Sequence, residues 1–365
     1  MEEELPAIVL DIGSAFTKAG FAGDDYPRGS EPMPTLVGLP KSSVGVQETA
    51  GDVAFLRRYQ FRIVHPVKRG LIQDWDCLEK LLYYSYWTWL RSHPKTYGVL
   101  WSESSLKLDR KKITQLMFEK FEVPAFHLVN QGVLALMATG RTNGIVLEVG
   151  DGCSQSIPVV EGYALRHAIM EVDFAGYDLT RYWMESVGAS SEFASDTILN
   201  HDVMRIMKEK LCHVALDYES SKNDTSVVEY ELPDGSIIKA GNERFKCAEL
   251  LFQPHLIGLD ILGIHESVIT SIRKCDIDCR KLMFNNIILS GGSTLMKGIV
   301  ERLRNELVES TSSCTKIAVK DVPERRFLPW IGGSIAASLS TFQSLAISAT
   351  EFAEAGSNIL YRKYQ

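Results

Sequence analysis

Two stretches of this sequence repeat one pattern, and the repeat constrains the fold more than any other feature. The segment IVLDIGSAFTKAG begins at Ile8, and IVLEVGDGCSQS begins at Ile145. Each begins with three apolar residues, continues with an acid, and then reaches a glycine among small residues, as a strand does before a sharp turn. We therefore predict one strand-turn-strand hairpin used twice, and repetition of this kind indicates duplicated domain cores.

The two copies align at a constant offset. The aligned pairs are Asp11 with Glu148, Gly13 with Gly150, Ser14 with Asp151, and Lys18 with Gln155. A glycine-rich turn lets backbone N–H groups approach phosphate oxygens, and the preceding carboxylate can hold Mg²⁺ through water. One copy alone is most often an ordinary strand and turn, but two copies predict a nucleotide held between two halves of the chain.

Composition sets the class of protein. The 365 residues are enough for two domains, and 45% hydrophobic and 23% charged residues are typical of a soluble globular protein. The net charge of −7 and the scattered basic pairs argue against direct nucleic-acid binding. The N-terminus is acidic, and no apolar run approaches the roughly 20 residues of a membrane span. We expect a protein of the cytosol or nucleus.

The seven cysteines show an odd count and no Cys-x-x-Cys, so we expect no disulfide framework. Cys275 and Cys279 are four residues apart, with His265 upstream, a spacing that would put two thiols on one helix face. Two free thiols in a helix are favoured over a zinc site, because no second ligand pair accompanies them.

The order of elements predicts a mixed α/β fold. Apolar spacing, caps and turn residues predict helices at 75–90 (cap Asp74), 110–121 (cap Asp109), 131–139 (closed by Gly140) and 202–216, strands at 61–64 and 123–126, and a hairpin at 229–239 around Pro233-Asp234-Gly235. A strand at 286–289 leads into a third glycine turn, Ser290–Thr294, which we expect to open a helix from Met296. Small residues after Trp330 predict close helix packing.

Longer blocks carry a family resemblance from end to end. They are KAGFAGDDYPR (18–28), VPAFHLVNQGVLALMATGRTNGIVL (123–147), EGYALRHAI (161–169), MKEKLCHVALDYE (207–219), YELPDG and GNERF (within 230–245), LFQPHLIG and GIHE (within 251–266), KCDID (274–278), LSGGSTL (289–295) and WIGGSIAASLSTF (330–342). The chain resembles actin and the actin-related proteins. The resemblance implies a two-domain actin-like ATPase fold, with residues 1–130 plus 331–365 as the small domain and 131–330 as the large one. Their outer subdomains would be 33–63 and about 174–266.

The resemblance also implies a nucleotide site for ATP or ADP with Mg²⁺ or Ca²⁺. Around the phosphates it implies Gly13, Ser14, Ala15, Phe16, Lys18, Gly150, Asp151, Gly152 and Cys153. Around the nucleoside it implies Lys208, Glu209, Gly291, Gly292, Ser293, Met296 and Arg326. Asp11 and Glu148 would bind the metal through water, and Gln131 would also lie at the metal's waters. Gln131 and Gln155 would place the attacking water.

Several residues depart from the family pattern. Glu148 replaces an aspartate and is longer by one methylene, which moves the carboxylate by about 1.5 Å. Gln155 replaces a histidine, and glutamine cannot take up a proton near neutral pH. Gly132 replaces an alanine, at a cost of roughly 1 kcal/mol in helix stability. The loop between Gly38 and Gly51 is shorter than actin's, which argues against contacts of that kind between identical subunits. The ending Arg362-Lys-Tyr-Gln365 differs from the family's, so we expect partner binding there to differ as well.

These observations lead to a functional hypothesis. We expect an ATP-binding cytoskeletal protein of the cytoplasm, a filament or complex subunit with slow or impaired hydrolysis, whose partners are actin-like subunits or actin-binding proteins. The alternative is a non-polymerising subunit of a chromatin-remodelling or dynein-associated complex, which would allow a nuclear role. A sugar or acetate kinase is disfavoured, because no second catalytic aspartate motif stands out. The apolar loop Leu256–Ile264 is expected to seek a partner.

Overall fold

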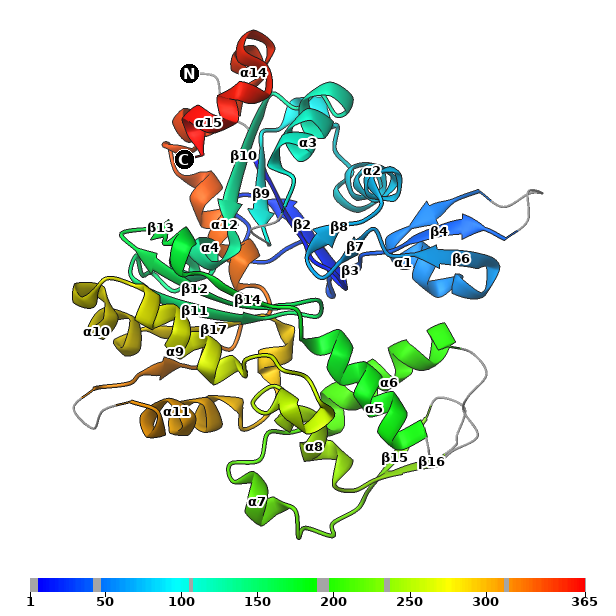
Figure 1. Ribbon diagram of the computed structural model, residues 1–365. Coiled ribbons are helices and arrows are strands. Elements are labelled where there is room, and N and C mark those ends of the chain that lie inside the picture. Colours follow the sequence, from blue (N-terminus) through cyan, green and yellow to red (C-terminus); the bar gives the residue numbers. More distant parts are fainter. Residues whose placement is uncertain are drawn as a thin grey trace. The chain divides into compact units, whose positions relative to one another are not determined.

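The computed structural model describes residues 6–41, 47–104, 108–188, 197–232, 237–311 and 315–364. It divides into two compact units (Figure 1). Unit 1 comprises Met1–Thr142, Glu161–Ala164 and Phe327–Gln365, and unit 2 comprises Asn143–Val160 and Leu165–Arg326. The helix at 131–138, with which the predicted second domain begins, lies in unit 1.

Unit 1 is built on a sheet in the order β19-β10-β9-β1-β2-β3. Its strands are β1 (Ile8–Ile12), β2 (Phe16–Phe21), β3 (Met33–Pro34), β9 (Val99–Glu103), β10 (Ala125–Asn130) and β19 (Ile347–Ser348). The strands β1 and β2 are antiparallel, whereas β9 runs parallel to both β1 and β10. All five residues of β1 are buried, so the acid Asp11 enters the sheet among apolar neighbours.

Helices and short segments surround this sheet. The α-helices of unit 1 are α1 (Gly51–Leu56), α2 (Trp75–Tyr84), α3 (Arg110–Gln115), α4 (Gln131–Ala138), α12 (Leu328–Ser338), α13 (Phe342–Leu345), α14 (Ala349–Ala355) and α15 (Leu360–Lys363). π-Helical segments η2 (Ser85–Leu90) and η4 (Leu116–Lys120) extend α2 and α3. The minor strands are β4 (Val37–Pro40), β5 (Thr49–Ala50), β6 (Phe61–Val64), β7 (Val67–Lys68) and β8 (Leu71–Ile72), and the 3-10 turns are η1 (Arg58–Gln60), η3 (Pro94–Thr96) and η8 (Gly356–Ile359).

The helices α4 and α12 approach each other through glycine. A Cβ on Gly332 would lie 1.8 Å from the Leu134 carbonyl oxygen, so only glycine fits there. Trp330 is fully buried beside them and donates its indole N–H to the Val9 carbonyl oxygen at 3.1 Å. The close packing predicted from the small residues of this segment is therefore confirmed.

Unit 2 repeats the strand arrangement of unit 1. Its main sheet contains β11 (Gly144–Val149), β12 (Ser154–Val160), β14 (Met170–Val172), β17 (Ile287–Ser290) and β18 (Val319–Lys320), with β13 (Tyr163–Ala164) beside β12. The order β18-β17-β11-β12-β14 matches β10-β9-β1-β2-β3 strand by strand, with the same parallel and antiparallel pairings. The duplicated cores predicted from the repeated sequence are confirmed.

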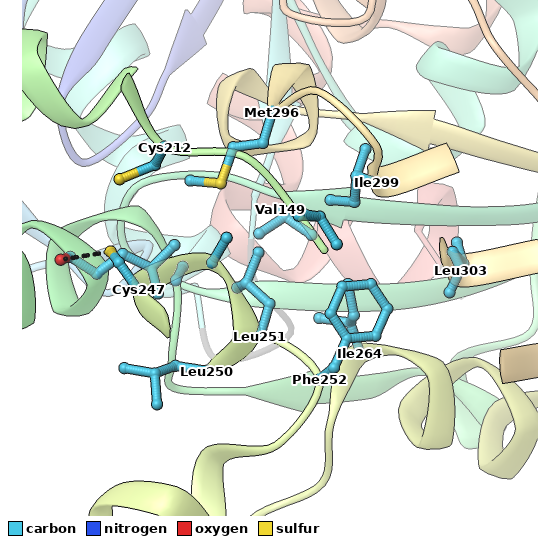
Figure 2. Close-up of a cluster of buried hydrophobic side chains, with 14 of the residues drawn as sticks. Val149, Cys212, Cys247, Leu250, Leu251, Phe252, Ile264, Met296, Ile299 and Leu303 are labelled. Atoms are coloured by element: carbon cyan, nitrogen blue, oxygen red, sulfur yellow. Dashed lines mark hydrogen bonds between the residues drawn. The ribbon is translucent and has the colours of Figure 1, made fainter. Parts of the chain in front are cut away.

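The remaining elements of unit 2 cover a continuous core. They are α5 (Gly176–Gly188), α6 (Thr197–Leu211), α7 (Tyr218–Ser221), α8 (Glu243–Glu249), α9 (Ile264–Lys274), α10 (Ile277–Asn285), α11 (Ile299–Glu309), β15 (Val228–Glu231), β16 (Ile237–Ala240), η5 (Arg166–Ala168), η6 (Pro254–Ile257) and η7 (Gly292–Leu295). Figure 2 shows part of this core, where Val149 at the end of β11 lies among Met296, Ile299 and Leu251. The end of the second hairpin is thus held by a packed apolar cluster.

Most predicted elements are present, with shifted ends. The predicted caps Asp74 and Asp109 each accept a backbone N–H three residues ahead, from Cys77 and Lys112. The strand expected at 123–126 was placed wrongly: β10 starts at Ala125, because Pro124 has no N–H to donate to a ladder, and it continues to Asn130. The pairing of the predicted 229–239 hairpin is confirmed, and its turn at 233–236 lies outside the described residues.

Two helix predictions need correction. The helix expected to run to residue 216 ends at Leu211, and the chain then turns so that the Val214 N–H can reach the Lys297 carbonyl oxygen at 2.8 Å. The third glycine turn forms the 3-10 turn η7 instead of opening a helix at Met296, and α11 starts at Ile299, after Gly298 takes a left-handed φ of 87°.

Cys275 and Cys279 do not share a helix, which corrects the expected arrangement. Cys275 ends α9 in an extended conformation, and Cys279 lies in α10. Six cysteines are free thiols, and Cys314 lies outside the described residues. In the described ranges, no group of three or more His, Cys, Asp or Glu side chains is placed to hold a metal. Within the same ranges no helix combines the length and apolarity that a membrane span requires.

Candidate functional site: two matching hairpin ends

The first hairpin places its acid and its lysine opposite each other. In the β1–β2 ladder Asp11 pairs with Lys18, so both side chains lie on one face of the sheet. The Lys18 ammonium donates to the Asp11 carboxylate at 2.6 Å, and the Asp11 side chain is 5% exposed. Lys18 therefore neutralises a carboxylate that would otherwise be costly to bury.

The turn between β1 and β2 is closed by its own backbone. The Gly13 N–H donates to the Phe16 carbonyl oxygen at 3.0 Å. The Ser14 hydroxyl accepts the Gly70 N–H at 3.0 Å, and the Ala15 carbonyl oxygen accepts the Thr35 N–H at 2.9 Å. Neighbouring segments of unit 1 thus fix the loop that was predicted to bind phosphate.

Gln131 stands at the first position of α4 in the same unit. The helix is capped by Asn130, whose side chain accepts the Gly132 N–H at 2.9 Å. The Gln131 side-chain amide donates to the Ser104 carbonyl oxygen at 3.3 Å, and the residue is 5% exposed. Since β10 runs directly into α4, Gln131 emerges at the carboxyl edge of the sheet.

The second hairpin repeats this construction with different side chains. Glu148 pairs with Gln155 in the β11–β12 ladder, in the same position as Asp11 with Lys18. Gln155 is 2% exposed, and its amide donates to a Glu171 carboxylate oxygen in β14 at 2.9 Å. A neutral amide therefore replaces the lysine of the first copy.

The loop of the second hairpin is also closed in the same way. The Gly150 N–H donates to the Cys153 carbonyl oxygen at 3.2 Å, matching the bond from Gly13 to Phe16. The Gly150 carbonyl oxygen accepts the Ser293 hydroxyl at 2.7 Å and the Gly176 N–H at 3.1 Å. The structure thus brings the predicted residues Gly150 and Ser293 together at the start of α5.

Close packing at α5 explains why glycine occupies position 176. A Cβ there would lie 2.6 Å from the Ser293 hydroxyl oxygen and 3.1 Å from the Gly150 carbonyl oxygen. The Asp151 carbonyl oxygen accepts the next N–H of the helix, that of Tyr177, at 2.8 Å. The Gly150–Cys153 loop therefore lies against a helix N-terminus, where the dipole favours negative charge.

Of the predicted pair, Lys208 is buried and Glu209 lies at the surface. Lys208 is 3% exposed, and its ammonium donates to the Gly176 carbonyl oxygen at 2.7 Å and to the Thr180 hydroxyl at 2.9 Å. Burial lowers the pKa of Lys208. Glu209 is half exposed and pairs with Arg205 at 3.1 Å. Lys208 thus supports the start of α5 from inside unit 2.

The third glycine turn lies against the second hairpin. Gly291 has φ of 91°, and its N–H donates to the Arg325 carbonyl oxygen at 2.9 Å, which places the turn beside Arg326. A Cβ on Gly291 would lie 2.3 Å from the Val149 carbonyl oxygen, whereas Gly292 has nothing within 4 Å. Met296 is buried in the core cluster with Val149.

The residues present fit a phosphate group and a hydrated divalent cation. Both loops start with a glycine and are closed by a backbone hydrogen bond, and the second lies at the N-terminus of α5. Asp11 and Glu148 provide the carboxylate oxygens that Mg²⁺ and Ca²⁺ prefer. The candidate residues gather within their own units: Asp11 to Lys18 and Gln131 in unit 1, the others in unit 2.

Fold and site together define a two-unit α/β protein whose cores are duplicated around matching acid-glycine hairpins. Comparison with protein families assigns the class: the chain matches the Actin family over residues 2–365. It belongs to the actin family. The actin-like fold expected from the sequence is thereby confirmed, and this fold generally binds ATP or ADP with a divalent cation.

Sequence reasoning missed some residues of the hairpin ends. Gly176 lies against Gly150, and Glu171 accepts a hydrogen bond from Gln155, yet neither residue belongs to a glycine-rich or acid-glycine motif. Ser102 and Ser290 end up in the sheets beside the two acids. Pairing between strands places Glu171, Ser102 and Ser290, and packing at the N-terminus of α5 places Gly176. Ser290 begins the third glycine turn, which is the one local signal that could have identified it.

Proposed function

We propose that this chain binds ATP or ADP with Mg²⁺ or Ca²⁺ and serves as a subunit of a cytoplasmic, cytoskeletal filament or complex. One observation carries the proposal: the same hairpin end, with an acid at the same ladder position and a closed glycine loop, is built twice. Membership of the actin family supports it.

Each unit supplies its own set of ligands in this proposal. The loop from Gly13 to Phe16, with Lys18, binds phosphate oxygens, and the loop from Gly150 to Cys153 does the same from unit 2. Asp11 and Glu148 accept hydrogen bonds from waters of the cation. Ser293, the Gly291–Gly292 turn and Arg326 contact the nucleoside, with Lys208, Glu209 and Met296 shaping that part of unit 2.

Binding is tested by equilibrium dialysis of radiolabelled ATP with and without Mg²⁺. We expect about one ATP per chain, bound more tightly when Mg²⁺ is present because the cation neutralises phosphate charge. Chain that retains no ATP under either condition would contradict the proposal. AMP serves as the competitor control, since it lacks the phosphates that the two loops are proposed to bind.

Hydrolysis is proposed to be slow. Gln131 and Gln155 place water, yet neither amide takes up its proton, so the step lacks a general base at these positions. The bond from Gln155 to Glu171 at 2.9 Å also directs the amide N–H₂ toward β14. Phosphate release should rise in Gln155→His, which supplies a base. Equal release by the two proteins would exclude this role for Gln155.

Assembly is proposed to use the apolar loop Leu256–Ile264. Leu256, Ile257, Ile261 and Leu262 are each between 36% and 43% exposed, and adjacent exposed apolar residues of this kind mark interaction surfaces. Sedimentation with Mg-ATP tests whether the chain forms filaments. Ile261→Asp should lower the sedimenting fraction, and the exposed Ile277→Asp is the control.

The alternative is a subunit that does not polymerise, in a chromatin-remodelling or dynein-associated complex. The short loop between Gly38 and Gly51 favours it, although residues 42–46 of that loop lie outside the described residues. In this case the wild-type protein stays in the supernatant at all concentrations. Its partners would then be recovered by native purification.

A further inference from the structure

Two serines occupy the same place in the two sheets, next to the two acids. In the β11–β17 ladder Glu148 pairs with Ser290. In the β1–β9 ladder Leu10 pairs with Trp101, so the next position along sets Asp11 beside Ser102. Residues in register on parallel strands point to the same face. Each sheet therefore carries a row of three polar side chains: Lys18, Asp11 and Ser102 in unit 1, and Gln155, Glu148 and Ser290 in unit 2.

The hydroxyls of these serines are buried and have no hydrogen-bond partner among the described residues. Ser102 is 1% exposed and Ser290 is fully buried. Leaving a buried hydroxyl unsatisfied costs about 1–3 kcal/mol. Two such hydroxyls at matching positions in duplicated sheets indicate a group that is bound there in the working protein.

Other buried serines in the same sheet of unit 2 do have partners. The Ser154 hydroxyl donates to the Phe174 carbonyl oxygen at 2.6 Å, and the Ser156 hydroxyl lies 2.9 Å from that of Ser267. A strand serine in this fold can therefore satisfy its hydroxyl internally. Ser92, outside the strands, also has a buried hydroxyl without a partner, but among the strand serines that the structure describes only Ser102 and Ser290 have one.

We propose that in each unit the serine hydroxyl beside the acid is a further binding group for a hydrated divalent cation: Ser102 holds a water of the cation's shell beside Asp11 in unit 1, and Ser290 holds one beside Glu148 in unit 2. The inference rests on the proposed nucleotide and cation binding. A serine hydroxyl suits this task, because it can donate to one oxygen and accept from another. Partners in the outer shell of a metal typically change its affinity by about 10–100-fold.

The two serines should contribute unequally. Lys18 already neutralises Asp11 at 2.6 Å, whereas the ladder partner of Glu148 is the neutral amide of Gln155. Lys18 therefore competes with a cation for Asp11, whereas the amide of Gln155 is no such competitor at Glu148. Ser290 is therefore the more important of the two positioning residues.

The test compares Ser290→Ala, Ser102→Ala and the control Ser156→Ala. Calorimetry measures ATP binding in EDTA and Mg²⁺ binding to the ATP complex, and thermal unfolding is followed without nucleotide. We expect Ser290→Ala to weaken Mg²⁺ binding about tenfold and Ser102→Ala less, with ATP binding in EDTA unchanged. Their unfolding midpoints should stay the same or rise, because an unsatisfied hydroxyl is removed.

The control should behave in the opposite way. Ser156→Ala leaves the Ser267 hydroxyl without its partner, so the unfolding midpoint should fall while Mg²⁺ affinity stays the same. The inference would be overturned if Ser290→Ala and Ser102→Ala both bound Mg²⁺ as tightly as wild type, or if they lowered the unfolding midpoint without changing Mg²⁺ affinity. Either result would leave the proposed ATP binding standing. A wild-type protein that binds no ATP would instead overturn the proposed function as well.

Discussion

Replacing Gly291 by alanine should destabilise unit 2 at the point where the third turn meets the second hairpin. The added Cβ would lie 2.3 Å from the Val149 carbonyl oxygen and 2.7 Å from its carbonyl carbon. Ordinary contacts begin near 3.4 Å, so the backbone must move by about 1 Å. Both atoms belong to main chain, which cannot rotate away as a side chain would.

Two costs add up in this variant. A φ of 91° costs an L-residue about 1–2 kcal/mol relative to glycine. Overpacking of a tight contact costs about 1–3 kcal/mol more. The sum, about 2–5 kcal/mol, corresponds to a fall in Tm of about 4–20 °C for a unit of this size. Because Val149 precedes Gly150, the shift also moves the loop proposed to bind phosphate, so ATP affinity should fall.

The assay is thermal unfolding followed by circular dichroism, with ATP binding measured on the same samples. Gly292→Ala is the matched control, since nothing lies within 4 Å of its Cβ and its φ is not in the left-handed region. It should melt within about 2 °C of wild type, the effect of a change below about 0.5 kcal/mol. Gly291→Ala melting together with Gly292→Ala would refute the reasoning.

Two further predictions concern buried charges. Glu249 is fully buried and accepts two hydrogen bonds from Arg302, at 2.7 and 2.9 Å. In chemical denaturation, Glu249→Ala should lower the free energy of unfolding by about 3 kcal/mol or more, because it leaves the Arg302 charge buried without its partner. The control Glu219→Ala, at an exposed ion pair, should change it negligibly. Burial lowers the pKa of His127 to about 4. As the pH falls, His127 therefore takes up a proton in the unfolded chain before it does so in the folded one. The free energy of unfolding should fall by up to about 3 kcal/mol as the pH drops from about 6.5 to 4. His127→Gln should flatten that part of the pH profile.

Local signals explain which elements could be predicted from the sequence. The helix α2 was predictable because Asp74 provides a cap and the apolar residues recur at helical spacing. The hairpins were predictable because the repeat fixes their turns. The start of α11 was not, because the left-handed φ of Gly298 depends on its packing against Val214, 84 residues earlier in the chain.

The candidate site divides along the same line. Loop residues such as Gly13 and Gly150 belong to recognisable acid-glycine motifs, so the sequence alone identifies them. The alignment of Ser290 with Glu148 depends on a parallel ladder between strands more than one hundred residues apart, and no local pattern encodes that register. Lys208 was identified by resemblance, whereas its bonds to the start of α5 could be learned only from the folded chain.

The central claim is that the two hairpin ends bind nucleotide phosphate and a cation. Calorimetric titration of Mg-ATP into the wild-type protein and into Lys18→Met tests it most directly, with the exposed Lys120→Met as control. The account predicts one ATP per chain for wild type and control, and binding at least about 100-fold weaker for Lys18→Met, which loses a charge-assisted phosphate contact and unpairs buried Asp11. Equal affinity in all three proteins, or no binding by wild type, would contradict it.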